Sequence, residues 1–304
     1  MWLDALLPWF GSFAEQVVLI TGASSGIGRQ TALTFARQRA QVALVARRRP
    51  WLAKVAAEVK AAGGQALIVP ADVTDATAAK AAVDQVRRSW GRVDVLVNNA
   101  GILKASPVER LPEADLDAML RVNLFGALFM MQAALPLMHR QGRGTIINIA
   151  SLGGRRGVPP LGGYCATKFA LVGLSEALRT ELDPAQIHVG LVMPGVIDTP
   201  MAQSVETEPD GGPWPSAFNM PPEWVAAAVV LAARFGLREI AVPPGAATME
   251  LLGAMAPGIT DTLIRWGSAA GRVLARATRT ETAPPARAAK PRGTGRKRQQ
   301  HRPP

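Results

Sequence analysis

Seven short runs rich in Val, Ile and Leu recur along the chain, and Ala-rich segments of helical length separate most of them. The runs are apolar throughout instead of alternating with polar residues, which is typical of strands covered on both faces. They occupy residues 16–21, 41–46, 65–70, 93–98, 144–150, 187–193 and 239–242, with helices expected at 27–39, 50–62, 76–90, 112–140 and 163–182. This order predicts an α/β fold, a doubly wound and mostly parallel seven-stranded sheet with helices on both faces.

The basic residues are concentrated at the C-terminal end. Of the net charge of +11, the segment 272–304 contributes +9, because it holds ten Lys or Arg and one acid. It has almost no large apolar side chains, so it cannot bury enough surface to offset its chain entropy. We therefore expect a disordered basic tail at 272–304, a single folded domain at 14–271, and an apolar N-terminal extension at 1–13. Within the domain, residues 198–222 are rich in Pro and Gly, and we expect them to form a substrate lid.

A single cysteine, Cys165, excludes a disulfide within the chain and favours a reducing, cytoplasmic compartment. The sequence contains no run of about 18 uncharged apolar residues, so it predicts no membrane-spanning helix. The opening MWLDALLPWFGSF has two open interpretations, an interfacial helix on a membrane or a segment folded against the body. The basic tail leaves open a peripheral contact with an anionic membrane. Nucleic acid is disfavoured as a partner, because the tail has no aromatic side chains to stack on bases.

The first predicted strand leads directly into TGASSGIG, which carries three glycines. Gly22 permits a tight turn, Gly26 lets the backbone approach a pyrophosphate, and Gly28 lets the following helix pack on the strand. The first N–H groups of that helix then face the anion. Because the motif lies between a strand and an amphipathic helix, it predicts a nucleotide site more strongly than glycines alone would.

The end of the second predicted strand distinguishes between two cofactors. An acid there would bind the adenosine ribose hydroxyls of NAD, whereas an arginine suits the 2′-phosphate of NADP. The chain reads LVARRRP at 44–50, with no acid nearby. We expect Arg47 to bind the phosphate by charge-assisted hydrogen bonds, so that NADP is preferred over NAD. Arg48 and Arg49 are better explained as a solvated basic turn.

The only tyrosine of the chain, Tyr164, lies four residues before Lys168 in a predicted helix. Residues at this spacing share a helix face, so the ammonium group should lie beside the phenol. At about 5 Å and an effective dielectric of about 20, one positive charge favours the phenolate by roughly 3 kcal/mol, or about two pKa units. We therefore expect Lys168 to lower the pKa of Tyr164 towards neutral and make the pair a usable acid or base.

The motifs TGASSGIG, NNAG at 98–101 and YCATK, together with Asn123 and Ser151, have the order and spacing typical of one family. Over about residues 14–245 the chain resembles the compact, single-domain branch of the short-chain dehydrogenase/reductase family. The resemblance implies a Rossmann sheet, NAD(H) or NADP(H) as cofactor, and the interconversion of alcohols and carbonyls. It also implies a homo-dimer or tetramer, formed through the two long helices that contain Asn123 and Tyr164.

The resemblance also implies individual roles. Tyr164 would be the general acid or base, and Lys168 would lower its pKa and hold the nicotinamide ribose. Ser151 would bind the substrate oxygen, and Asn123 would hold a water near Lys168. Taken singly, Ser151 is equally explained as a turn residue and Asn123 as a helix cap or kink. The implied cofactor-binding residues are Gly22, Ser24, Ser25, Gly26, Ile27, Gly28, Arg47, Asp72, Val73, Asn98, Ala100, Gly101, Tyr164, Lys168, Pro194, Gly195, Ile197 and Thr199.

The substrate is less constrained by the sequence. Arg155 and Arg156 lie between two expected catalytic residues, where they either meet an acidic substrate or, as we favour, pair with solvent or a partner subunit. Apolar residues of the lid and the C-terminal region predict a hydrophobic lipid-, steroid- or retinoid-like substrate, unless they only pack the core. A 3-oxoacyl-thioester reductase and a non-catalytic NADP-binding sensor or scaffold stay open as alternatives. The apolar residues in question are Met201, Trp214, Phe218, Met220, Leu251, Leu252 and Met255.

Overall fold

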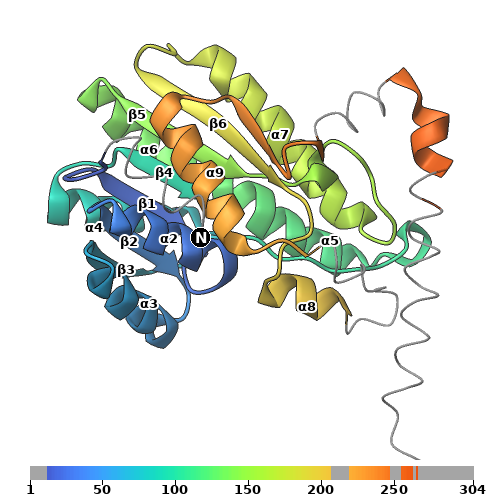
Figure 1. Cartoon of the computed structure of the whole chain (residues 1–304), viewed down its shortest axis with the longest axis horizontal. Coiled ribbons are helices and arrows are strands. Elements are labelled where there is room, and N and C mark those ends of the chain that lie inside the picture. The colour runs from blue at the N-terminus through green and yellow to red at the C-terminus, as the bar shows by residue number, and fades with distance from the viewer. Residues whose placement is uncertain (1–11, 207–218, 247–254, 263–264, 266–304) are drawn as a thin grey trace, which may run out of the picture.

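A sheet of seven parallel strands forms the centre of the molecule (Figure 1). The computed structural model describes residues 12–206, 219–246, 255–262 and 265. The strands lie in the order β3-β2-β1-β4-β5-β6-β7, so the chain adds strands on one side of β1 and then, from β4, on the other. This order confirms the predicted doubly wound topology. The strands are β1 (Val17–Thr21), β2 (Gln41–Ala46), β3 (Gln65–Pro70), β4 (Val95–Asn98), β5 (Gly144–Ile149), β6 (Ile187–Pro194) and β7 (Glu239–Val242).

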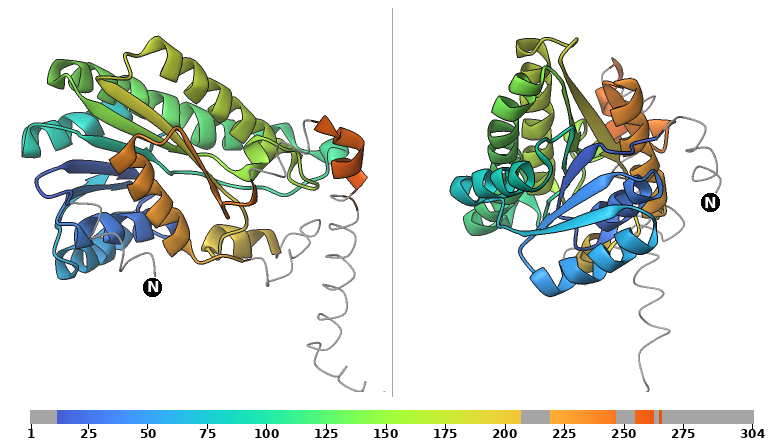
Figure 2. Two further views of the ribbon diagram at one scale, coloured as in Figure 1. Left: turned by 45° about the horizontal axis from the view of Figure 1, so that its top comes forward. Right: turned by 90° about the vertical axis from the view of Figure 1, so that its left-hand side faces the viewer.

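Helices cover both faces of the sheet, as the right-hand view of Figure 2 shows. Along β1, Val18 and Ile20 pack into one core with α2, α3 and α9, whereas Val17 and Leu19 pack into the other with α4, α6 and α7. Both faces of a strand are therefore buried, which explains why the strands read as continuous apolar runs. The helices are α2 (Gly26–Arg37), α3 (Arg49–Ala61), α4 (Ala76–Trp90), α6 (Gly126–Gln141), α7 (Gly162–Glu181) and α9 (Pro222–Phe235).

The helix expected at 112–140 is divided into three pieces. It begins as α5 (Glu113–Leu120), continues as a π-helical turn, η3 (Arg121–Phe125), and proceeds into α6. By length and composition the whole run is long and apolar enough to cross a membrane. In this fold, however, side chains such as Met130 and Met138 of the run are fully buried in the core.

The folded domain begins before the predicted boundary at residue 14. Phe13 is buried, and its ring meets that of Phe35 edge-on with centroids 4.9 Å apart. Its backbone N–H donates to the carbonyl oxygen of Gln38 at 3.2 Å, and the Arg234 guanidinium lies 5.4 Å from the ring centroid. Residues 1–11 of the N-terminal extension and the basic tail lie outside the described residues.

Shorter elements at the carboxyl ends of the strands complete the fold. The predicted lid starts as helix α8 (Pro200–Glu206). A β-bridge between Ile197, just before the lid, and Met220, near the C-terminal end of the lid, brings its two ends together. Trp214, Phe218, Leu251 and Leu252 lie outside the described residues. Two single-turn helices are η2 (Val108–Arg110) and η4 (Leu152–Gly154).

Candidate active site

Loops at the carboxyl ends of the strands enclose a cleft of about 1160 Å³. Pockets for one small ligand are usually about 300–1,000 Å³, so this cleft has room for a cofactor and a substrate together. Its walls come from the loops after all seven strands, as expected for a doubly wound sheet. Residues of the predicted site that line it are Gly22, Ser24, Ser25, Gly26, Ile27, Arg47, Asp72, Val73, Ala100, Gly101, Ser151, Tyr164, Lys168, Pro194, Gly195, Ile197 and Thr199.

The glycine-rich loop after β1 lies tightly against the end of β4. Gly22 has a φ of 65°, and a Cβ there would come 2.8 Å from Nδ2 of Asn99. That Nδ2 donates to the carbonyl oxygens of Thr21 at 2.9 Å and Gly22 at 3.3 Å. A Cβ on Gly28 would lie 2.4 Å from the Gly22 oxygen, so Gly28 supports the loop from beneath and does not line the cleft. Sequence reasoning missed Asn99, although it is the second asparagine of NNAG.

Asn98 braces the sheet, as the family resemblance implies, but it is not among the residues that line the cleft. Its Nδ2 donates to Oδ1 of Asn148 at 2.9 Å, and Nδ2 of Asn148 donates to Oγ of Ser175 at 2.8 Å. All three residues are buried, and their hydrogen bonds join β4, β5 and α7. The physical reason is position, because Asn98 is the last residue of β4 and faces its neighbouring strand.

The end of β2 presents its arginines to the cleft. Arg47, which we expect to bind a phosphate, is exposed and lines the cleft, and Arg48 lines it too. The guanidinium of Arg48 lies 4.5 Å from the ring centroid of Trp51, so this side chain is stacked on an aromatic and is not simply solvated. After β3, Oδ1 of Asp72 accepts hydrogen bonds from the backbone N–H of Thr74 at 3.0 Å and its hydroxyl at 2.8 Å, which holds the turn beside the cleft.

Ser151, Tyr164 and Lys168 lie together on the cleft wall. Oγ of Ser151 accepts the N–H of Gly153 at 3.0 Å, donates to the Pro194 carbonyl at 3.3 Å, and hydrogen-bonds Tyr164. Nζ of Lys168 donates to the carbonyl oxygen of Ile149 at 2.8 Å. It lies 5.7 Å from the ring centroid of Tyr164, so the expected juxtaposition of the two side chains is present. The arrangement places two hydroxyl groups and one buried amine at a single point of the cleft.

A sequence model of the family described as short chain dehydrogenase matches residues 16–210. The chain belongs to the short-chain dehydrogenase/reductase family. It is accordingly an oxidoreductase, in a family that binds NAD or NADP.

Relatives in the family span most of this chain. The ketoacyl reductase HetN of Nostoc sp. is 34% identical over 257 residues, which cover 83% of this chain and 88% of that protein. The 3-ketodihydrosphingosine reductase of Bacteroides thetaiotaomicron is 40% identical over 184 residues, or 60% of this chain and 65% of that one. The crystal structure of levodione reductase has a TM-score of 0.72 at 31% identity, with coverage of 77% and 99%.

The electrostatics of this short-chain dehydrogenase/reductase site differ from the sequence prediction. Burial raises the pKa of Tyr164 to about 12, although a hydrogen bond with Ser151 opposes the rise. Burial also lowers the pKa of Lys168 to about 8. The expectation that Lys168 alone brings Tyr164 towards neutral is therefore wrong for the free protein, because desolvation disfavours the charged form of both groups. Tyr164 still has an exposed side on the cleft, and at neutral pH it retains its proton.

Asn123 occupies the π-helical turn between α5 and α6 and is buried away from the cleft. Its Nδ2 donates to the Ile102 carbonyl at 2.9 Å and to Oγ1 of Thr167 at 3.0 Å, and its Oδ1 accepts the Ile102 N–H at 2.8 Å. The Thr167 hydroxyl in turn donates to the Tyr164 carbonyl at 2.8 Å. Asn123 thus joins the loop after β4 to the first turn of α7, which carries Tyr164.

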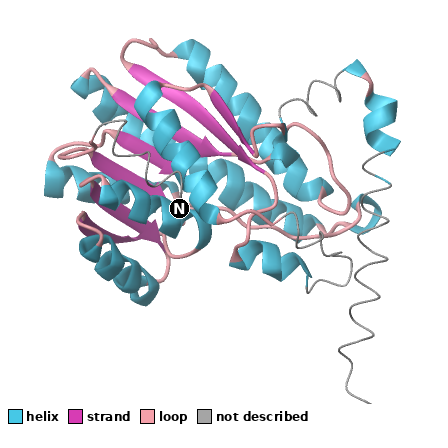
Figure 3. Ribbon diagram, in the orientation of Figure 1, coloured by secondary structure: helices cyan, strands magenta, loops and turns pink. Residues whose placement is uncertain are grey.

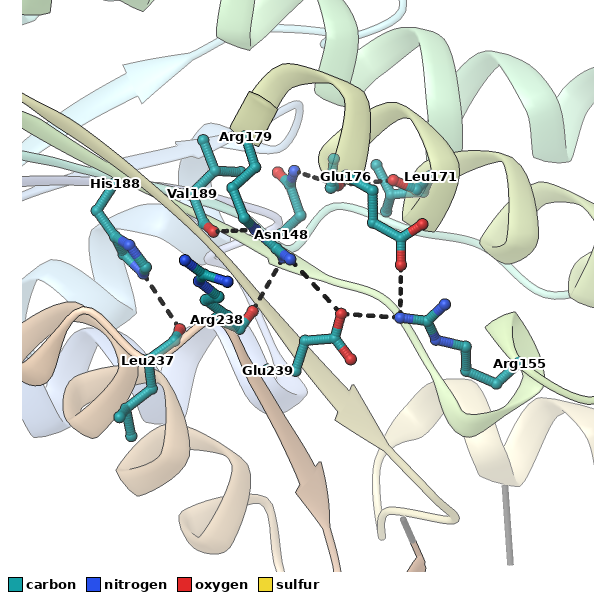
Figure 4. A network of polar contacts seen from close by, with 11 residues as sticks. Asn148, Arg155, Leu171, Glu176, Arg179, His188, Val189, Leu237, Arg238 and Glu239 are labelled. Atoms are coloured by element: carbon teal, nitrogen blue, oxygen red, sulfur yellow. Dashed lines mark hydrogen bonds and ion pairs between the residues drawn. The ribbon is translucent and has the colours of Figure 1, made fainter. Parts of the chain in front are cut away.

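The two arginines after Ser151 pair with acids of their own chain. Arg155 forms ion pairs with Glu176 of α7 at 2.7 Å and Glu239 of β7 at 2.8 Å, and Arg179 approaches the same Glu239 at 3.7 Å (Figure 4). Arg156 forms an ion pair with Asp261. The favoured interpretation, pairing with solvent or a partner subunit, missed these contacts because the acids are distant in sequence.

Proposed function

We propose that this protein is an NADP(H)-dependent oxidoreductase that interconverts a hydroxyl and a carbonyl on a neutral, hydrophobic substrate. The observation that carries the proposal is the position of Tyr164, Ser151 and Lys168 on one wall of a cleft shared with the glycine-rich loop. Reduction of a carbonyl needs a hydride, a proton and groups that stabilise charge on the oxygen. The cleft has room for the cofactor that would supply the hydride. Its side chains can supply the proton and stabilise the charge on the oxygen.

The residues of the cleft fit a dinucleotide. The backbone of the loop 22–27 would hold the pyrophosphate. Gly22 and Gly28 keep this loop packed closely on the structure beneath it, where a Cβ at either position would clash. Asp72 would meet the adenine and Lys168 the nicotinamide ribose. Arg47, exposed at the end of β2 with no acid nearby, supports NADP over NAD. When bound, the nicotinamide supplies or accepts the hydride.

The side chains of the site divide the remaining work of carbonyl reduction. Tyr164 carries its proton at neutral pH, as an ordinary phenol does, and can donate it to the carbonyl oxygen. The Ser151 hydroxyl hydrogen-bonds the same oxygen and stabilises the charge that develops there. The Lys168 ammonium then stabilises the phenolate that remains after the proton has moved. In the reverse direction, the phenolate accepts the proton of the alcohol.

The chemistry of the cleft walls favours a neutral, apolar substrate. Arg155 and Arg156 line the cleft, but their charges are balanced by Glu176, Glu239 and Asp261, which argues against a carboxylate or phosphate as the main recognition element. This favours a lipid-, steroid- or retinoid-like ketone over an acyl-carrier thioester. Apolar side chains that line the cleft include Leu103, Val122, Leu152, Val158, Leu161 and Met201.

The decisive experiment measures NADPH oxidation by the purified full chain with a panel of hydrophobic ketones and aldehydes, and repeats it with NADH. We expect turnover with at least one apolar ketone, faster with NADPH. Tyr164→Phe should reduce turnover by about a hundredfold or more and leave NADPH affinity within about twofold of the parent. NADPH binding without turnover of any carbonyl would instead favour a sensor or scaffold.

We further infer that the protein forms a homo-dimer or tetramer through α5–α6 and α7. Two phenylalanines on these helices, Phe125 in the π-helical turn and Phe169 in α7, are 42% and 44% exposed in the single chain. A symmetric contact between copies would bury both. Light scattering should show an oligomer that Phe169→Glu dissociates, and a monomeric parent would contradict the inference.

A further inference from the structure

A short segment at 255–262, helical from residue 257, lies against the cleft and is held there by an arginine. One terminal nitrogen of Arg156, Nη2, donates to the Pro257 carbonyl at 3.2 Å and to Oγ1 of Thr260 at 3.0 Å, and it also pairs with the Asp261 carboxylate. Thr260 is only 7% exposed and lines the cleft. In Figure 1 the segment, coloured orange-red, lies at the upper right of the molecule.

The loop that carries Arg156 is itself held by hydrogen bonds and ion pairs. The N–H of Gly154 donates to the Ser151 carbonyl oxygen at 2.8 Å. The N–H groups of Arg155 and Arg156 both donate to the Leu152 carbonyl oxygen, at 3.1 and 3.2 Å. The Arg155 side chain connects this turn to α7 and β7 through its two glutamates (Figure 4). Arg156 therefore extends from a fixed turn that begins at the catalytic Ser151.

Apolar burial contributes little to holding the segment. Its two large apolar side chains, Met255 and Ile259, are 77% and 65% exposed, and both point to solvent. Thr260 is buried, and Ala256 is partly buried. Among the contacts of the described residues 255–262, those of Arg156, including a charge-assisted one, are thus a main source of attachment.

We propose that Arg156 is a positioning residue that holds residues 255–262 over the cleft, so that Thr260 forms a wall of the substrate site and large hydrophobic substrates are preferred over small ones. A large ketone that reaches this wall gains contact with it, whereas a small ketone beside Tyr164 does not. The kinetic consequence rests on the proposed function, but the attachment of the segment does not.

The first test measures amide hydrogen exchange of peptides covering 255–262 in the full chain. Arg156→Met removes the charge and keeps most of the stem, and we expect exchange to become about tenfold faster. Exchanging the charges, Arg156→Asp with Asp261→Arg, should restore much of the protection. Arg87→Met is the matched control, because Arg87 pairs with Asp84 on α4 and does not line the cleft. Unchanged exchange in Arg156→Met would overturn the proposal.

The second test compares cyclohexanone with a steroid ketone, using NADPH. In Arg156→Met we expect the KM for the steroid to rise about fivefold or more, while kcat and the KM values for cyclohexanone and NADPH stay within about twofold. An equal rise for both ketones would overturn the selectivity, because it would mean general damage to the loop. If the parent reduces no ketone, the proposed function fails, and hydrogen exchange alone decides whether Arg156 holds the segment.

Discussion

Nζ of Lys168 lies 5.7 Å from the ring centroid of Tyr164, yet the pKa of the phenol is raised and not lowered. The charge is close enough to favour the phenolate, but burial disfavours ionisation of both side chains, and burial is the larger effect. The site therefore keeps its proton on Tyr164 until the reaction takes it. Lys168 is better placed to stabilise the phenolate after transfer than to create it in the free protein.

Because Tyr164 is the only tyrosine, its ionisation can be followed directly by phenolate absorbance. We expect the midpoint in the folded protein at a pH of about 12, against about 10 in urea. Since the folded pKa is the higher one, the neutral phenol favours the folded state below pH 10, and this advantage is lost as pH rises towards 12. A folded midpoint at or below that in urea would contradict the prediction.

The pH dependence of carbonyl reduction should follow Lys168. Burial lowers its pKa to about 8, so the free enzyme loses the ammonium charge as pH rises through that value. We expect kcat/KM to be constant below about pH 7 and to fall above the pKa of this group. Lys168→Arg, which stays charged, should remove the fall even if its rate is lower. A parent profile that stays flat far into the alkaline range would refute the assignment.

Exchanging one charge at the end of β2 should change cofactor preference. Arg47→Glu places a carboxylate where we expect the 2′-phosphate, so NADPH affinity should fall by about tenfold to a hundredfold while NADH affinity stays constant or improves. Arg49→Glu, two residues on and not among the residues that line the cleft, is the matched control. Equal losses in both variants would mean that only the general field of the basic turn matters.

A methyl group at Gly28 should disturb the cofactor loop. A Cβ there would meet Nδ2 of Asn99 and the Gly22 carbonyl oxygen, both at 2.4 Å, so neighbouring backbone must shift. We expect Gly28→Ala to lower the free energy of unfolding by about 1–3 kcal/mol and to weaken NADPH binding. Gly157→Ala is the control, since its Cβ would have no neighbour within 4 Å. Calorimetry measures the stability of each variant, and cofactor titration measures its affinity for NADPH. Equal stability and affinity in the two variants would contradict the packing role of Gly28.

Much of this protein follows from local sequence patterns. The seven apolar runs predicted the strands to within two residues, because strands buried on both faces must be continuously apolar. Spacing likewise predicted that Tyr164 and Lys168 share a helix face. Such features depend on neighbours in the chain, which the sequence displays directly.

Tertiary structure decided the features that depend on partners far along the chain. Asn98 and Asn99 are adjacent and chemically identical, yet one bonds Asn148 within the sheet and the other holds the glycine-rich loop. Arg156 finds its acid 105 residues away. The pKa of Tyr164 is set by how much protein surrounds the ring, a quantity that exists only after folding. Burial and long-range pairing are properties of the assembled core, and they decide which of several plausible roles a side chain has.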